Sequence, residues 1–113
     1  MSTEMFVTAV RSAGDRAGVF EYTERTGYFY LYDQAGREGK RILNAIHILS
    51  GVPDFTESDV DVRWARGEGM VGLLIRGQLW AVFRDGERFG GNYRSGSPPA
   101  LPRGVAEAFS SPT

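Results

Sequence analysis

Cysteine is absent from this chain of 113 residues, and histidine occurs only once. The lack of thiols excludes a disulfide framework, thiolate zinc sites and a cysteine nucleophile. A single histidine also leaves too few ligands for a typical structural or catalytic zinc site. We therefore expect no metal site and no cofactor.

An excess of charge of one sign is missing as well. Thirteen Lys and Arg residues face fourteen Asp and Glu residues, which gives a formal net charge of −1. Nucleic-acid binders normally carry a basic footprint, so we expect no nucleic-acid partner. No apolar run approaches the ~20 residues of a membrane helix. The first residues, MSTEMFVTAVRSAGD, lack the basic start and apolar stretch of a secretory signal. These absences predict a cytoplasmic protein without a membrane partner.

The chain is instead rich in glycine, with 15 residues, and 42% of it is hydrophobic. Glycines recur between short apolar runs, as in chains that form many β-turns. The length points to one domain, which we predict over residues 1–94. Residues 95–113 are rich in Pro, Gly and Ser, and we expect this tail to be mobile or to pack only through Leu101 and Phe109. A short helical turn is possible around 104–109.

The first half of the chain predicts four strands. Residues 5–10, 19–23 and 27–33 alternate, and the last two are aromatic-rich. The link ERTG predicts a hairpin turn that uses Gly27 for a positive φ. Residues 41–49 fit either a helix face or a strand. We favour the strand because its neighbours are β.

The second half predicts another four strands, at 60–65, 70–75, 78–83 and 88–94. Short turns separate them, and Asp85-Gly86 is a strong hairpin signal. We therefore predict a mainly β fold of two antiparallel meanders, packed as a sandwich-like or strongly bent sheet.

The stretch VGLLIRGQLWAVF, residues 71–83, is apolar on both faces of both strands. Strands of this kind are covered on both faces, so this hairpin is expected at the centre of the core. Alternation places Leu79, Ala81 and Phe83 in the core. It leaves Arg76 and Trp80 as the residues of this hairpin that are available for function.

Three motifs favour structural over chemical interpretations. GEGMVG, residues 67–72, matches a phosphate-binding pattern, but a strand follows it where that pattern needs a helix. His47 lies among apolar residues, which favours a partly buried neutral histidine bonded to backbone. The acidic run over 54–61 lacks the glycine and the final glutamate of a calcium loop, so it reads as a solvated loop.

The tyrosines carry the strongest functional signal. Tyr28, Tyr30 and Tyr32 share one face of a single strand, and Tyr22 is expected on the paired strand. Cross-strand packing explains such a stripe in structural terms. The functional interpretation is a binding surface, because Tyr is enriched at interfaces. The candidate binding residues are Tyr28, Tyr30, Tyr32, His47, Arg63, Trp64, Arg76 and Trp80.

The stretches VFEYTERTGYFYLYD, ILNAIHIL and DVRWARGEGMVGLLIRGQLWAVF together resemble a family of small bacterial proteins of unknown function. The shared pattern is a TGYFY-like strand, an I-x-x-A-x-H-I segment, then RW and an LLI-x-G-x-x-AVF hairpin, over roughly residues 18–84. The chain departs from it at EYTERTG and at RDG, where the family is expected to carry more acid. The resemblance implies a compact, mostly β, stand-alone bacterial domain. It implies no activity and identifies no catalytic residue.

These features favour a non-catalytic module that binds an unknown protein partner, or a second copy of itself, through an aromatic sheet face. The alternative is a binder of small molecules or carbohydrates that stack on Tyr and Trp. An enzyme ranks last, because no nucleophile, base or metal constellation is visible. An open tyrosine face would favour a macromolecular partner, and a pocket gathering Tyr30, His47 and a Trp with an arginine would favour a ligand.

Overall fold

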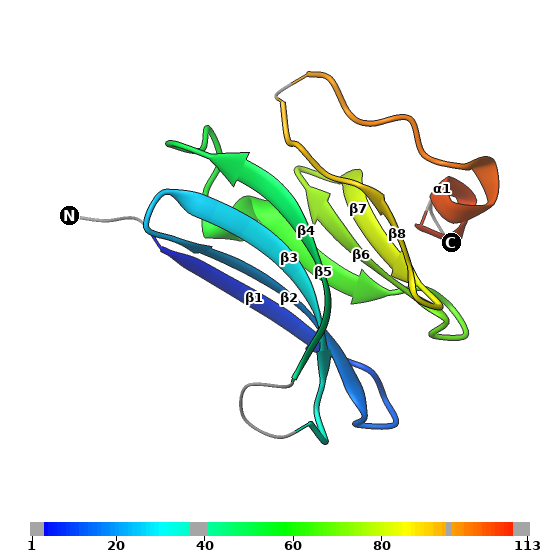
Figure 1. The fold of residues 1–113 in the computed structure, drawn as a ribbon. Coiled ribbons are helices and arrows are strands. Elements are labelled where there is room, and N and C mark those ends of the chain that lie inside the picture. The colour runs from blue at the N-terminus through cyan, green and yellow to red at the C-terminus, as the bar shows by residue number, and fades with distance from the viewer. Residues whose placement is uncertain (1–3, 37–40, 95, 110–113) are drawn as a thin grey trace.

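The computed structural model describes residues 4–36, 41–94 and 96–109, and it confirms a mainly β fold of two antiparallel meanders. Each meander forms one four-stranded sheet, and the two sheets lie as two layers (Figure 1). Sheet A contains β1 (Met5–Val10), β2 (Arg16–Thr23), β3 (Thr26–Asp33) and β4 (Ile42–Ser50). Sheet B contains β5 (Val60–Trp64), β6 (Met70–Ile75), β7 (Gln78–Arg84) and β8 (Glu87–Gly90). The two remaining elements are a 3-10 turn, η1 (Glu57–Asp59), and a helix, α1 (Arg103–Phe109).

The ambiguous segment at 41–49 is a strand, as favoured, because β4 pairs with β3 from one end to the other, with two register shifts. The segment after β8 differs from the expected strand over 88–94. β8 ends at Gly90, and the chain then crosses to sheet A. There the Asn92 N–H donates to the His47 carbonyl at 3.1 Å and the Tyr93 N–H to the Ile48 carbonyl at 2.6 Å. These bonds tie the two sheets together along one side.

Two tight turns show how local sequence sets the hairpins. Asp85 and Gly86 both have positive φ, as an Asp-Gly hairpin requires. The β2–β3 turn instead places Glu24 and Arg25 at positive φ. Gly27 does not supply that conformation, so the sequence expectation for this glycine is wrong. It lies within β3, where a Cβ would come within 2.6 Å of the Leu49 side chain.

The main core lies between the two sheets. Its largest fully buried side chains are Trp80, Phe20, Phe29, Ile48, Leu73, Ile75 and Val71. The rings of Phe29 in sheet A and Phe83 in sheet B stack with their centroids 4.9 Å apart, which joins the layers. Full burial of each large apolar side chain contributes on the order of 1.5–3 kcal/mol.

Trp80 belongs to this core, with 1% of its surface exposed. This corrects the expectation that Trp80 is available at a surface. The register between β6 and β7 shifts by one residue, because Leu73 pairs with Ala81 whereas Leu74 pairs with Leu79. Such a bulge breaks the alternation of side chains. Trp80 therefore packs with the core between the sheets, and Leu79 packs with Val82 on the opposite face.

The outer face of sheet B is covered by α1, which lies on the side away from sheet A (Figure 1). Val105 and Phe109 are buried there against Ala65 and Val82. Val105 and Phe109 therefore both anchor the tail to sheet B. The sequence expectation named Phe109 and Leu101 but not Val105. Residues 95 and 110–113 of the tail lie outside the described residues, and the boundary at 94 stays a prediction.

Among the residues that the structure describes, no helix has the length and apolar character needed to cross a membrane.

Candidate functional site

The outer face of sheet A presents three rows of residues that the strand register places side by side. Directly paired residues of antiparallel strands point to the same face. One row contains Phe6, Glu21, Tyr28 and His47, the next Thr8, Val19, Tyr30 and Ala45, and the third Val10, Ala17, Tyr32 and Ile42. We call these twelve residues the tyrosine face.

The three tyrosines form a continuous stripe along the middle of this face, as the alternation predicts. The rings of Tyr28 and Tyr30 stack at 5.7 Å with an interplanar angle of 17°, and those of Tyr30 and Tyr32 are tilted at 5.9 Å. Each tyrosine is half-buried, and the neighbouring Ala17 and Val19 are buried. Burial, with the negative charge of Glu21, raises the pKa of Tyr30 above its usual 10.0. Tyr30 therefore stays uncharged at neutral pH.

Tyr22 does not join the stripe. Its register partner on β3 is Gly27, and its side chain is buried in the core between the sheets. The hydroxyl donates a hydrogen bond of 2.6 Å to the Gly51 carbonyl. Tyr22 does lie on the paired strand β2, as expected, but its side chain points inward because it has the same parity as Phe20.

His47 is exposed rather than partly buried, which corrects the sequence expectation. It lies opposite Tyr28, on an edge strand, and its ring meets the Tyr28 ring edge-on at 5.4 Å. Its Nε2 shares a hydrogen bond of 3.0 Å with the Ser50 hydroxyl, not with backbone. Alternation along β4 buries Ile46 and Ile48 and turns His47 outward.

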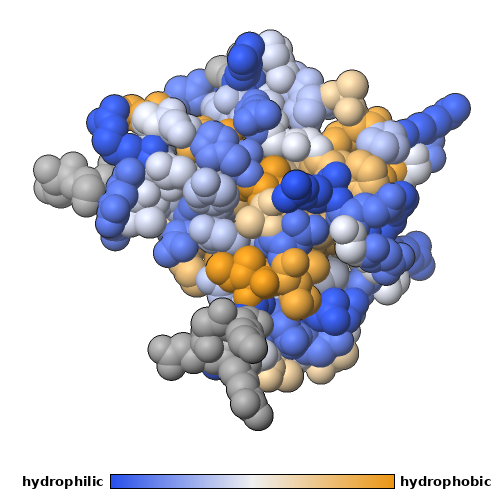
Figure 2. All heavy atoms as spheres, in the orientation of Figure 1, coloured by the Kyte–Doolittle hydropathy of each residue, from blue (hydrophilic) through white to orange (hydrophobic). Residues whose placement is uncertain are grey.

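Exposed apolar side chains flank the stripe on both sides, and sequence reasoning missed them. Phe6 and Val10 on β1 are 57% and 50% exposed, and Ile42 on β4 is 52% exposed. Leu43, beside Ile42, is exposed as well. Hydrophobic atoms, in orange, reach the surface among paler and blue residues in Figure 2. The signal that could have found them is the register between strands, which the individual strand patterns do not contain.

The other candidate residues lie away from the tyrosine face. Trp64 is half-buried at the β5 edge, and its Nε1 donates to the Ala9 carbonyl at 2.9 Å. Arg63 is exposed on β5 and pairs with Asp61 at 2.6 Å. Arg76 lies in the β6–β7 turn, where it bonds to the Asp54 carbonyl and approaches Asp59 at 3.6 Å. The structure therefore does not join these residues to the tyrosine stripe.

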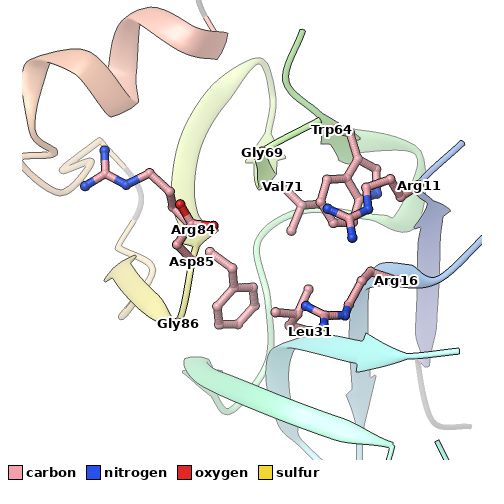
Figure 3. Close-up of a pocket in the computed structure, with 10 residues that line it drawn as sticks. Arg11, Arg16, Leu31, Trp64, Gly69, Val71, Arg84, Asp85 and Gly86 are labelled. Atoms are coloured by element: carbon pink, nitrogen blue, oxygen red, sulfur yellow. The ribbon is translucent and has the colours of Figure 1, made fainter. Parts of the chain in front are cut away.

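A second candidate site is a small hollow at the end of the sandwich where several hairpin turns meet (Figure 3). We call it the end pocket, and its volume is about 60 Å³. It is lined by Arg11, Arg16, Leu31, Trp64, Gly69, Val71, Phe83, Arg84, Asp85 and Gly86. It combines a tryptophan with arginines, as a ligand pocket was expected to do, but neither Tyr30 nor His47 lines it.

Acidic neighbours already bind two of the three arginines of the end pocket. Arg11 donates through Nε and Nη2 to the two carboxylate oxygens of Asp15, at 2.9 and 2.6 Å, and lies over the Trp64 ring. This pair lowers the pKa of Asp15 to about 2, with a smaller contribution from the charge of Arg16. Arg84 turns away from the pocket and pairs with Glu87 at 2.9 Å (Figure 3).

Within the described residues, no group of three or more His, Cys, Asp or Glu side chains is arranged to hold a metal ion. The acidic run lies between the two sheets in sequence. Asp54 is in the loop after β4, Glu57 and Asp59 are in η1, and Asp61 is in β5. Glu57 accepts a hydrogen bond from the Phe6 N–H at 3.0 Å, and Asp59 accepts one from the Thr56 N–H at 2.9 Å. These carboxylates therefore organise the loop and the neighbouring strand edge.

Comparison with known protein families matches residues 1–109 to the family described as "Uncharacterized protein conserved in bacteria (DUF2251)". The chain belongs to this family. The match covers both sheets and α1, so it extends beyond the stretch of residues 18–84 that carried the resemblance in sequence. No curated protein and no solved structure matches the chain. The DUF2251 domain described here is therefore a small, mainly β bacterial domain of unknown function.

Proposed function

We propose that this DUF2251 protein is a non-catalytic interaction module that binds a protein partner through the tyrosine face. The observation that supports this proposal most strongly is that one outer sheet face is covered and the other is exposed. Sheet B is covered by α1, whereas the outer face of sheet A exposes Phe6, Val10 and Ile42 around three half-buried tyrosines. Exposed apolar patches of this kind commonly mark interaction surfaces.

The composition of the face supports a protein partner. Among its three rows of four residues, Glu21 alone carries a formal charge, and His47 is the other titratable group besides the tyrosines. The centres of protein interfaces are depleted in charge and enriched in tyrosine and phenylalanine. Tyrosine also offers a large contact area at a low cost in side-chain entropy.

The edges of sheet A favour binding through the face rather than through strand addition. The backbone N–H groups of Asn92 and Tyr93 already donate to two backbone carbonyls along β4. On β1, Glu57 accepts the Phe6 N–H and Trp64 bonds to the Ala9 carbonyl. An added strand needs free backbone groups along an edge, and these contacts remove several of them.

Two surface hollows lie away from the stripe tyrosines. One is the end pocket, and the other is a groove beside β1 and β2 that is lined by Glu4, Met5, Phe6, Glu21, Tyr22, Thr23 and Glu57. A carbohydrate or small molecule stacked on the stripe would therefore lie outside both of these hollows. This geometry suits a macromolecule better, because small ligands bind in concave sites that bury most of their surface.

Site-directed photo-crosslinking in the native bacterial host tests the proposal. A photoreactive residue is placed at Val10 or Ile42 on the face, and at Val52 as the control. Val52 is 76% exposed but lies in the loop after β4, outside the face. We expect discrete crosslinked protein species from positions 10 and 42, and none of them from position 52.

A second experiment shows whether the tyrosines take part. Tyr30→Ala should abolish the crosslinks from position 42 while the circular dichroism spectrum stays unchanged, because Tyr30 lies outside the core between the sheets. Crosslinks that are equal from all three positions, or absent from the face, would contradict the proposed interaction surface.

A further inference from the structure

We propose that the end pocket binds a small aliphatic monocarboxylate, with Arg16 as the residue that holds the carboxylate. This inference is independent of the tyrosine face, because Arg16 points inward between the sheets. Its parity along β2 is that of Phe20, on the face opposite to Ala17 and Val19. The pocket opens where the two sheets separate at their hairpin end (Figure 3).

Arg16 is the arginine of the pocket whose donors remain available. Arg11 is bound by Asp15 and by the Glu68 carbonyl, and Arg84 is bound by Glu87. Arg16 is half-buried, and within the described part of the chain its side chain makes no hydrogen bond or ion pair, although its charge acts on Asp15. Its register partner across the sheet, Asp33, accepts the Ala35 N–H at 3.0 Å. A guanidinium group presents donors in a planar fork that matches the two oxygens of a carboxylate.

The walls of the pocket define the rest of the ligand. Leu31, Val71 and Phe83 line it with apolar surface, and Val71 and Phe83 are buried members of the core. A ligand with a short aliphatic tail would bury that tail against these side chains while its charged end meets Arg16. The volume of about 60 Å³ limits the tail to a few carbon atoms.

The charges around the pocket favour a monoanion over phosphate. Asp85 lines the pocket, and Asp15 and Glu68 lie beside Arg11 next to it. These negative charges would repel a dianion more strongly than a monoanion. A single carboxylate suits Arg16, the arginine of this pocket that makes no ion pair within the described residues.

Titration of the isotope-labelled protein with butyrate, followed by amide chemical shifts in NMR, tests the proposal. We expect saturable shifts at Gly69, Val71 and Gly86, and weaker binding of inorganic phosphate. Arg16→Gln should weaken butyrate binding by about tenfold or more, because it removes a charge-assisted pair of hydrogen bonds. Arg63→Gln is the matched control, since Arg63 is an exposed arginine that lies outside the pocket.

Arg16→Lys keeps the charge but loses the fork, so it should bind butyrate with an affinity between those of the wild type and Arg16→Gln. If the amide spectrum shows that Arg16→Gln does not fold, Arg16→Lys replaces it as the test variant. The proposal is overturned if butyrate produces no saturable shifts, if phosphate binds as tightly, or if Arg63→Gln weakens binding as much as Arg16→Gln.

Discussion

Val105→Ala is the sharpest test of how α1 contributes to stability. Val105 is completely buried in the cluster that α1 forms with Ala65 and Val82 on sheet B. The substitution removes two methyl groups, worth about 1.6 kcal/mol of transfer free energy at ~0.8 kcal/mol each. The cavity that remains adds to this loss, so the free energy of unfolding should fall by about 2–3 kcal/mol. At roughly 4 °C per kcal/mol for a domain of this size, the Tm should fall by about 8–12 °C.

Urea denaturation followed by tryptophan fluorescence measures this change, with Val52→Ala as the control. The control makes the same chemical change at a side chain that is 76% exposed, so it should alter the free energy of unfolding by less than about 0.5 kcal/mol. A seven-residue helix is too short to be stable when detached. Equal small effects of the two substitutions would therefore show that docking of α1 adds no stability, and would refute the reasoning.

The remaining predictions concern single contacts. Gly72→Ala should lower the free energy of unfolding, measured in urea, by about 1–3 kcal/mol, because the added Cβ would come within 2.8 Å of the Phe109 ring and 2.9 Å of Leu79. Gly69→Ala is the control: its Cβ would meet no atom within 4 Å, so the free energy of unfolding should change little. Trp64→Phe should lower the free energy of unfolding by about 1 kcal/mol in the same assay, because phenylalanine keeps an aromatic ring but cannot donate a hydrogen bond to the Ala9 carbonyl. An unchanged free energy of unfolding would show that this hydrogen bond does not contribute to stability. The pKa of Asp15 is lowered to about 2 in the fold, below its usual 3.8, so the Arg11–Asp15 pair stabilises the fold above pH 3.8 and this contribution disappears as the pH falls through about 2. The difference in free energy of unfolding between wild type and Asp15→Asn should accordingly be constant near neutral pH and vanish in strong acid. Burial raises the pKa of Tyr30 above 10.0, so the unfolded chain releases this proton first and stability should fall as the pH rises past 10.0. In ultraviolet titration, the difference between wild type and Tyr30→Phe should be a group that titrates above pH 10.0, and a difference that titrates at or below 10.0 would contradict the shift.

The strands were predictable because their patterns are local. Alternation placed Tyr28, Tyr30 and Tyr32 on one face of β3, and the Asp85-Gly86 turn fixed the β7–β8 hairpin. Residues 41–49 were assigned correctly from their β neighbours, although their own pattern also fitted a helix. Local sequence was sufficient to place these strands, including β3 and β4, whose pairing contains two register shifts.

The errors arose where register or distant contacts decide the outcome. The bulge in β7 turned Trp80 into the core, and alternation alone does not reveal a bulge. The flanks of the tyrosine face depend on which residues of β1 and β4 stand beside β3. The end pocket gathers residues from hairpin turns far apart in the chain, such as Arg16 and Gly86. No single stretch of sequence contains that proximity.

The order of the elements along the chain has a consequence for folding during synthesis. The strands of sheet A, and then those of sheet B, pair with neighbours that have just been made, so both hairpin meanders can form as they leave the ribosome. The segment that joins the sheets through Asn92 and Tyr93, and the helix that shields sheet B, follow all eight strands. A nascent chain therefore exposes the apolar outer surface of sheet B until α1 emerges. During that interval we expect the chain to be most prone to aggregation and most dependent on chaperones.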